Sequence, residues 1–237
     1  MNKGVQIIKR CAEIVSDFVY PKVCIVSGNK LQEHNSNDFV EDAVLYSLER
    51  VTPEDNKDSK HKLRCDFAFC MYYFRENGST QTIIHNLKYS GLSGIGIMLG
   101  ELIGREINTL YKNDLKGYDY LIPVPLYKSR IRERGYNQSE IICKGISDVI
   151  GIQVLSKNIL RVRNTKSQTG LNIAERKENV KGAFGINVNF ANALAGKNVL
   201  LVDDVITTGA TVHEVINVLR NSKVNSIGVI AAALTKD

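Results

Sequence analysis

The sequence predicts an α/β fold in which helices flank a mainly parallel sheet, with a small appendage on the N-terminal side. In the second half of the chain, short apolar runs alternate with segments of helical periodicity, which is the pattern of strands joined by crossover helices. One run, Val199 to Val202, has no polar alternation and is typical of a strand covered on both faces. Residues 22–64 are polar and irregular, so we expect an appendage over 1–66 and a main domain over 67–237.

The N-terminal part combines helical and irregular stretches. Apolar residues recur at helical spacing from Val5 to Phe18, and Pro21 ends that helix. A short helix is expected near Glu41 to Leu48, and a mobile loop around Glu54 to Lys62. The run from Phe67 to Phe74 is continuously aromatic and apolar, so it is predicted to be the first strand of the main domain.

The main domain is predicted to alternate helices and strands. Helices are expected at Thr80–Tyr89, Ser93–Tyr111, Asn137–Ile150 and Ala210–Leu219. Strands are expected at Tyr120–Val124, Ile159–Val162, Ala183–Ile186, Asn198–Val202 and Ser226–Ala233. Gly96, Gly100 and Gly104 recur at four-residue steps and predict close packing of their helix. Because right-handed crossovers give a parallel sheet, a ligand is expected at the carboxyl ends of its strands.

Composition excludes several classes of protein. Hydrophobic residues make up 43% of the 237 residues and charged residues 24%, which is the balance of an ordinary globular protein. No run approaches the roughly eighteen apolar residues of a membrane span, and the N-terminus lacks the apolar region of a secretion signal. Five cysteines without paired spacing favour free thiols over a disulfide framework. We therefore expect a cytoplasmic protein with no membrane partner.

The positive charge of the chain is concentrated in one block. The net charge is +6, and the stretch from Lys128 to Lys181 contains twelve Lys and Arg against five acids. This block predicts an anionic ligand, although a solvated basic face would have the same composition.

The segment with the most chemical information is Asn198-Val-Leu-Leu-Val-Asp-Asp-Val-Ile-Thr-Thr-Gly-Ala-Thr211. Two carboxylates, Asp203 and Asp204, stand where the buried strand reaches the surface, and the turn after them opens a helix. A helix start offers unpaired N–H groups and the positive end of a dipole, which suit a phosphate. Gly209 lets the backbone approach phosphate oxygens closely, and three hydroxyls can donate further hydrogen bonds, those of Thr207, Thr208 and Thr211.

The acids beside this anion site are explained by a ligand that has both phosphate and vicinal hydroxyl groups. Asp203 and Asp204 would accept hydrogen bonds from those hydroxyls. Either half of the segment alone could be an acidic turn and a helix cap without a ligand. The whole string resembles the phosphoribosyl-pyrophosphate signature of type I phosphoribosyltransferases.

The resemblance extends to the ComF/GntX family of competence-associated, phosphoribosyltransferase-like proteins over roughly residues 68–234. The matching stretches come in the order and spacing of that family: His85-Asn-Leu-Lys-Tyr-Ser-Gly91, Ile122-Pro-Val-Pro-Leu126, Arg134-Gly-Tyr-Asn-Gln138, Arg161-Val-Arg-Asn-Thr165 with Gln168, and Arg176 through Asn179 to Ala183-Phe184.

The resemblance implies a type I phosphoribosyltransferase fold that binds 5-phosphoribosyl-1-pyrophosphate and transfers the phosphoribosyl group to an unidentified acceptor, in DNA uptake. Mg²⁺ would bind together with the sugar pyrophosphate, and no protein residue is assigned as its ligand. The implied catalytic residues are Asp203, Asp204 and Arg176. The implied ribose-phosphate site contains Asp203, Asp204, Thr207, Thr208, Gly209, Ala210 and Thr211.

Two basic segments are candidates for pyrophosphate. By resemblance, the loop Leu126 to Arg134 follows a strand and cradles pyrophosphate, with Lys128, Arg130 and Arg134 as its assigned residues. Lys88 is a fourth candidate, although a lysine at a helix C-terminus is also explained by the helix dipole.

The polar segment Arg163 to Lys181 is long for a connection in a compact domain. Its position resembles the flexible loop that closes over substrate in related transferases. Gln168, Arg176 and Lys181 are the candidate residues of this loop. The alternative is a mobile surface excursion.

Relatives in this family usually have a four-cysteine zinc-binding appendage. Here Cys24-Ile-Val-Ser27 and Val40-Glu-Asp-Ala43 stand at the two expected pairs, so one ligand of four remains. We predict no zinc and an appendage that is held by packing or is poorly ordered. Cys65 and Cys70 flank a predicted strand and are expected to be buried free thiols.

The rival hypothesis is a non-catalytic module that binds a nucleotide sugar or single-stranded DNA in a DNA-uptake apparatus. Its partners would be single-stranded DNA and a competence helicase, and the basic block would follow the DNA backbone. Base-stacking platforms usually need several aromatic residues, and the block offers only Tyr127, Tyr136 and Phe184. The sequence makes no prediction about the oligomeric state.

Overall fold

The computed structural model describes residues 21–165 and 173–236, and the chain forms two compact units, Met1–Leu48 and Glu49–Asp237. The boundary therefore lies after Leu48, earlier than the predicted boundary after residue 66. Residues 49–66 fold with the main domain because helix α3 (Pro53–Leu63) packs on strand β1 (Phe67–Phe74). The buried amide of Asn56 fixes this contact, since its Oδ1 accepts from the N–H of Cys70 at 2.6 Å.

The first unit has a small apolar centre. An antiparallel bridge joins Val23 to Lys30, and helix α2 (Asp42–Ser47) lies inside the stretch predicted to be helical. The Cys24 thiol is buried, and its sulfur accepts from the N–H groups of Ser27 and Glu41, each at 3.4 Å. Val40, which stands where the second cysteine pair was expected, is 0% exposed. Apolar packing thus occupies the middle of this unit.

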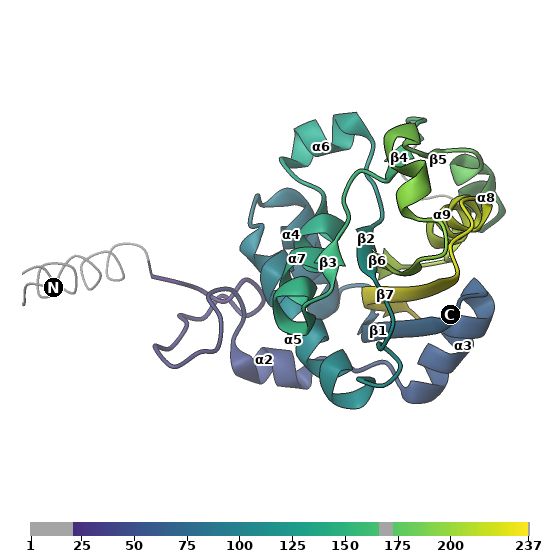
Figure 1. Ribbon diagram of the computed structural model, residues 1–237. Coiled ribbons are helices and arrows are strands. Elements are labelled where there is room, and N and C mark those ends of the chain that lie inside the picture. Colours follow the sequence, from purple (N-terminus) through teal and green to yellow (C-terminus); the bar gives the residue numbers. More distant parts are fainter. Residues whose placement is uncertain (1–20, 166–172, 237) are drawn as a thin grey trace, which may run out of the picture. The chain divides into compact units, whose positions relative to one another are not determined.

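The second unit is built on a five-stranded sheet whose order is β1-β7-β6-β2-β3, and every neighbouring pair is parallel (Figure 1). This confirms the predicted, mainly parallel α/β architecture. The strands after β1 are β2 (Tyr120–Pro123), β3 (Gln153–Val154), β6 (Asn198–Ile206) and β7 (Ser226–Thr235).

Helices cover both faces of this sheet. In Figure 1, α4 (Ser79–Tyr89), α5 (Gly94–Leu110) and α7 (Gln138–Ile150) lie on one side, and α3 and α9 (Ala210–Asn221) lie on the other. The predicted close packing of the glycine-containing helix is confirmed. A Cβ on Gly100 of α5 would overlap the carbonyl oxygen of Ile142 on α7, and a Cβ on Gly145 of α7 would overlap that of Ile97.

A second, antiparallel pair of strands forms the part that we call the hood: β4 (Ile159–Arg161), β5 (Phe184–Ile186) and helix α8 (Ile173–Val180). Ile159 and Phe184 are buried in the same core cluster as residues of α9, which fixes the hood on that face of the unit. A short 3-10 helix, Val188–Ala193, leads from the hood to β6.

Several local predictions were wrong. The expected loop around Glu54 to Lys62 is helix α3, which has Pro53 in its first turn and is capped by Thr52, whose Oγ1 accepts from the N–H of Asp55 at 3.1 Å. The expected loop Leu126 to Arg134 is largely helix α6 (Lys128–Arg134). The strand predicted to end at Val202 continues to Ile206.

The helix predicted over residues 5–18 lies outside the described residues. None of the helices in the described part of the chain is long and apolar enough to cross a membrane. Cys65 and Cys70 are buried free thiols, as predicted.

Candidate active site at the end of strand β6

The candidate site begins where β6 extends beyond the end of its neighbour β2. The last residue pair between these strands is Pro123 with Val202, so the rest of β6 pairs only with β7. The strand order also reverses between β2 and β6, and such reversal points are where parallel sheets bind ligands. The start of α7 closes the β2 side, since the amide of Asn137 donates to the carbonyl of Val124 at 3.0 Å.

Two neighbouring carboxylates lie on this open end of β6. Asp203 Oδ1 accepts from Ser139 Oγ at 3.1 Å and from the N–H of Asp204 at 2.9 Å. Asp204 is 8% exposed, and its Oδ2 lies 2.9 Å from the ammonium nitrogen of Lys88 at the end of α4. Because successive side chains of a strand point to opposite faces, the two acids reach different partners. The fold thus joins three predicted residues in one cluster.

The surroundings of Asp203 raise its pKa to about 7. Burial is the main cause and the charge of Asp204 the second, whereas the N–H of Asp204, Lys88 and Ser139 act in the opposite direction. Strongly shifted carboxyl groups are concentrated at functional sites, since their proton affinity suits reaction or ligand binding near neutral pH.

The turn after β6 opens helix α9 through a glycine in the left-handed conformation. Gly209 adopts a φ of 73° and precedes the first residue of α9, Ala210, whose N–H lies 3.5 Å from Thr208 Oγ1. A Cβ on Gly209 would lie 2.8 Å from Leu63 Cδ2, so this backbone position favours glycine in both conformation and space. The helix start lies next to the carboxylates, at the same edge of the sheet.

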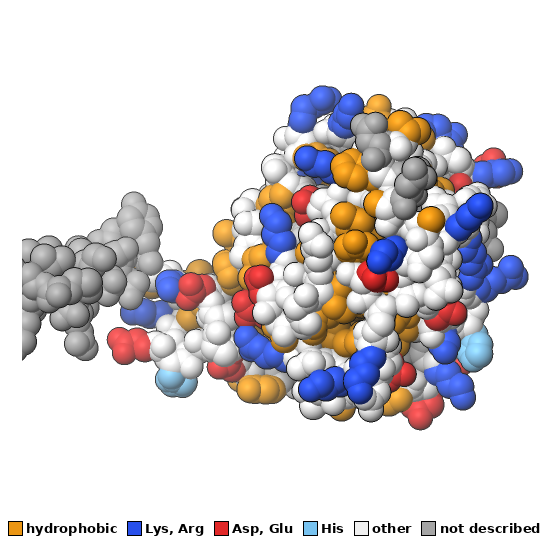
Figure 2. All heavy atoms as spheres, in the orientation of Figure 1, with side chains coloured by type: hydrophobic (Ala, Val, Ile, Leu, Met, Phe, Trp, Pro, Cys, Tyr) orange, Lys and Arg blue, Asp and Glu red, His pale blue; other side chains and the backbone are white. Residues whose placement is uncertain are grey.

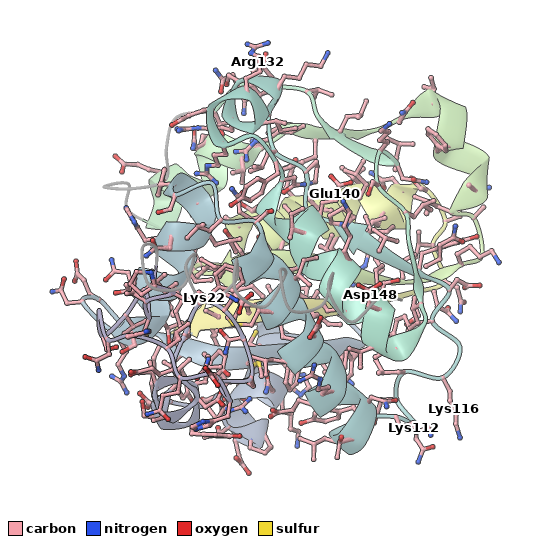
Figure 3. The ribbon with its side chains drawn as sticks, turned by 90° about the vertical axis from the view of Figure 1, so that its left-hand side faces the viewer. Lys22, Lys112, Lys116, Arg132, Glu140 and Asp148 are labelled. Carbon is pink, nitrogen blue, oxygen red and sulfur yellow. The ribbon has the colours of Figure 1, made fainter. Side chains whose placement is uncertain are left out.

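The basic residues after β2 are arranged by helix α6 rather than by a loop. The four basic residues of α6 are two positions apart, and residues four apart lie on the same face of a helix. They therefore form two pairs, Lys128 with Arg132 and Arg130 with Arg134. Lys128 and Arg132 are exposed, and Figure 3 shows Arg132 pointing away from the body of the domain. Figure 2 likewise shows Lys and Arg side chains gathered over this helix.

The second pair of α6 makes contacts closer to the domain. Arg130 forms an ion pair with Glu133 at 3.0 Å. Arg134 donates to Gln138 Oε1 at 3.0 Å, and its guanidinium lies 5.2 Å from the centre of the Tyr89 ring, next to Lys88 in the chain. Helix α6 therefore divides the four cations between two directions, and the assignment of Lys128, Arg130 and Arg134 to pyrophosphate stays a prediction.

The segment Arg163 to Lys181 contains helix α8 and is tied at both of its ends. The guanidinium of Arg163 donates to the carbonyls of Asn179 at 3.3 Å and Lys181 at 2.5 Å. The N–H of Gly182 donates to Glu214 of α9 at 2.6 Å, which anchors the hood. The ammonium of Lys181 is exposed and pairs with Glu178 at 3.8 Å.

The other two predicted residues of this loop cannot be placed in the site. Gln168 lies outside the described residues, and so does the side chain of Arg176. Their roles stay predictions.

Two residues around the site were not singled out from the sequence. Ser139 donates to Asp203, and Arg161 of the hood is influenced by the charge of Asp203. Arg161 is part of the stretch Arg161 to Thr165, and Ser139 directly follows Gln138. The sequence signal for Ser139 was three polar residues in a row at a predicted helix start, Asn137 to Ser139, and the structure shows all three to be buried.

The described residues contain no group of three or more His, Cys, Asp or Glu side chains that could hold a metal ion. Asp203 and Asp204 are the acids at the edge of β6, and carboxylate oxygens are the hard ligands that suit Mg²⁺. Such a pair fits an ion that arrives with its own phosphate oxygens better than one held by the protein alone.

Comparison with known proteins agrees with this geometry. Residues 146–236, which include β6, the turn and α9, match the family model of the phosphoribosyl transferase domain. With the parallel sheet and its strand order, this match defines the class: the main domain has a type I phosphoribosyltransferase fold.

The similar proteins are more specific. Competence protein F of Haemophilus influenzae is 40% identical over 148 residues, which is 62% of this chain and 64% of that protein. The DNA utilization protein YhgH of Escherichia coli K12 is 35% identical over 138 residues, 58% of this chain and 59% of that protein. The resemblance to the ComF/GntX family is therefore confirmed, over less than two thirds of the length of these relatives.

A solved structure, the glutamine phosphoribosylpyrophosphate amidotransferase of B. subtilis, aligns with a TM-score of 0.38 and 20% identity, covering 57% of this chain and 25% of that one.

Proposed function

We propose that this protein binds 5-phosphoribosyl-1-pyrophosphate and transfers its phosphoribosyl group to an acceptor, in a cytoplasmic process linked to DNA uptake. The observation that carries the proposal is the pair Asp203 and Asp204 beside the glycine-opened start of α9. A ligand that fits both features needs hydroxyl donors for the acids and a phosphate for the helix start. The link to DNA uptake is supported by the names of the relatives, a competence protein and a DNA utilization protein.

In this proposal the ribose hydroxyls donate to Asp203 and Asp204, and the 5-phosphate accepts from N–H groups and hydroxyls of the turn Thr207 to Thr211. A lone pair of the acceptor forms the new bond to C1 while the bond from C1 to the pyrophosphate oxygen breaks, and pyrophosphate leaves with those electrons. If the acceptor nitrogen bears a proton, it is lost from that nitrogen. Lys88, Lys128, Arg130 and Arg134 stabilise the negative charge of the leaving group.

Mg²⁺ would bind with the sugar pyrophosphate and neutralise part of its charge. Asp203 fits this arrangement, because both of its described hydrogen bonds go to Oδ1 and its Oδ2 remains available to a ligand. The side chains of Arg176 and Lys181 would come to the pyrophosphate from the hood and add charge-assisted hydrogen bonds.

Calorimetry of the full chain with 5-phosphoribosyl-1-pyrophosphate and Mg²⁺ tests the binding step. Replacing Asp203 and Asp204 together with Asn should weaken binding by about tenfold or more, because hydrogen bonds to charged groups contribute about 1.5–3 kcal/mol each. The control Asp148→Asn removes an exposed acid of α7 (Figure 3) and should bind as the wild type does. Unchanged affinity in the double variant contradicts the assignment. Pyrophosphate release with a panel of heterocyclic acceptors then tests the transfer.

The second candidate is a non-catalytic module that binds a nucleotide sugar or single-stranded DNA, with single-stranded DNA and a competence helicase as partners. The cations over α6 support it, since phosphate backbones bind such surfaces. An affinity for single-stranded DNA that falls steeply with salt and does not respond to the sugar pyrophosphate would favour this module over the enzyme.

A further inference from the structure

The hood contains a guanidinium that the proposed function leaves unused, that of Arg161. Residues of β4 alternate in direction: Ile159 is 3% exposed, Leu160 is 41% exposed, and Arg161 turns inward again. Its partner in the register is the buried Phe184, and the guanidinium lies 5.3 Å from the centre of that ring. The side chain is therefore held on the inner face of the hood.

The side chain of Arg161 is half-buried, and its Nε atom is fully buried. One NH₂ group donates to Thr165 Oγ1 at 2.5 Å, whereas Nε is buried and has no hydrogen-bond acceptor in the described part of the chain. No carboxylate of the described residues forms an ion pair with Arg161 either. Burial lowers its pKa, Asp203 acts against this effect, and the like charge of Arg130 adds to it. Because buried cations are normally paired, the site has a donor that lacks an acceptor.

Two other buried donors near the start of α7 also lack an acceptor among the described residues. Gln138 is 1% exposed, and its Nε2 has no partner, while its Oε1 accepts from Arg134. The Nε of Arg134 is unpaired as well. A fourth such donor is Nδ2 of Asn158, which directly precedes β4. All four unpaired groups are donors, so ligands that satisfy them offer acceptors, as carboxylate and phosphate oxyanions do.

The cations around the acids fall into two groups. Lys88 pairs with Asp204, and Arg134 stacks on the residue that follows Lys88, so these two lie on the α4 side. Arg161 lies on the hood, beside Phe184. A displacement at C1 brings the acceptor in on the face opposite to the leaving pyrophosphate. Lys88 and Arg134 can therefore serve pyrophosphate while Arg161 serves the acceptor.

We infer that Arg161 binds a carboxylate of the acceptor, so that the acceptor is a carboxylated heterocycle rather than a neutral nucleobase. The planar fork of a guanidinium binds a carboxylate through two parallel hydrogen bonds and would use the unpaired Nε. This inference rests on the proposed function and names the substrate class of the same site.

The test measures pyrophosphate release by the full chain with two sets of acceptors: orotate, nicotinate and quinolinate as carboxylates, and adenine, hypoxanthine and uracil as neutral bases. We expect reaction with at least one carboxylate. Arg161→Gln should raise the KM for that acceptor at least tenfold and leave the Kd of 5-phosphoribosyl-1-pyrophosphate within twofold. Arg161→Lys, which keeps the charge and loses the fork, should recover part of the loss. Arg132→Gln removes an exposed cation of α6 and serves as the control.

Each contrary result has a distinct meaning. Reaction with neutral bases only, or with no acceptor of the panel, overturns the carboxylate inference while the sugar pyrophosphate still binds. A tenfold loss of sugar-pyrophosphate affinity in Arg161→Gln overturns it as well, because the residue then holds pyrophosphate. If the wild type does not bind the sugar pyrophosphate at all, the proposed function itself fails, and the inference fails with it.

Discussion

Replacing Asp203 with Asn should make the ligand-free protein more stable at pH 8 than the wild type. Asp203 must ionise beside Asp204 in buried surroundings, which raises its pKa to about 7. Asparagine keeps the Oδ1 that accepts from Ser139 and from the N–H of Asp204, and it has no charge to bury. The variant therefore removes a cost of the folded state without removing the contacts of this side chain.

The size of the gain follows from the difference between the folded and unfolded pKa. An Asp in an unfolded chain titrates near about 3.9, so between about pH 4 and pH 7 the folded protein keeps a proton that the unfolded protein has lost. The stability of the wild type then falls by about 1.4 kcal/mol per pH unit in this window and stays level above it. The whole difference above pH 7 amounts to about 2–4 kcal/mol.

Urea denaturation at pH 4, 6 and 8 measures this difference. The free energies of unfolding of wild type and Asp203→Asn should nearly coincide at pH 4, diverge at pH 6 and differ most at pH 8, with the variant more stable. The variant Asp148→Asn, at an exposed acid of α7, is the control for the loss of one negative charge. A difference that is the same at all three pH values, or an Asn variant that is less stable at pH 8, would refute the reasoning. It would mean that Asp203 is already ionised at low pH in the folded protein.

Three further predictions concern other parts of the molecule. Lys88→Met leaves Asp204 without its ion-pair partner, so it should destabilise the fold by about 1–3 kcal/mol. The same pH series should also give a higher pKa for Asp203, because Lys88 lowers that pKa in the wild type. Gly209→Ala forces a side chain into a φ of 73° and against α3; it should cost about 1–3 kcal/mol in urea denaturation and weaken sugar-phosphate binding in calorimetry. Elemental analysis of protein purified without chelator should find no stoichiometric zinc, and one equivalent that is lost in Cys24→Ser would contradict this.

The sequence was most informative where a segment buries apolar surface on both sides. The strand Phe67–Phe74 has the predicted limits because every one of its eight residues is aromatic, apolar or a thiol. Helix α3 was missed because it is polar nearly throughout and buries only Asn56, Ser59 and Leu63. Its local signal was the pair Thr52-Pro53, a helix cap followed by proline, which predicts a start but gives no estimate of length.

The site was predictable in its parts and not in its connections. Asp203, Asp204 and Lys88 were each proposed from their own motifs, yet the ion pair between Lys88 and Asp204 depends on how α4 lies over the end of β6. Helical periodicity could have divided the four cations of α6 into two pairs, had that segment been recognised as a helix. The inward position of Arg161, whose Nε lacks an acceptor, depends on the register of β4 on β5, because a shift by one residue would turn the side chain outward.

The position of the acids within the basic block helps to separate the two candidate functions. A surface that binds only a single-stranded DNA backbone gains affinity from each cation and loses it from each nearby carboxylate. Asp203 and Asp204 lie next to Lys88, and burial together with the charge of Asp204 raises the pKa of Asp203. Deoxyribose has no vicinal hydroxyl pair to donate to two acids, whereas the ribose of a sugar pyrophosphate has one. The acids thus favour a ribosyl ligand at the end of β6, and DNA, if it binds, is expected over the exposed cations of α6, away from the acids.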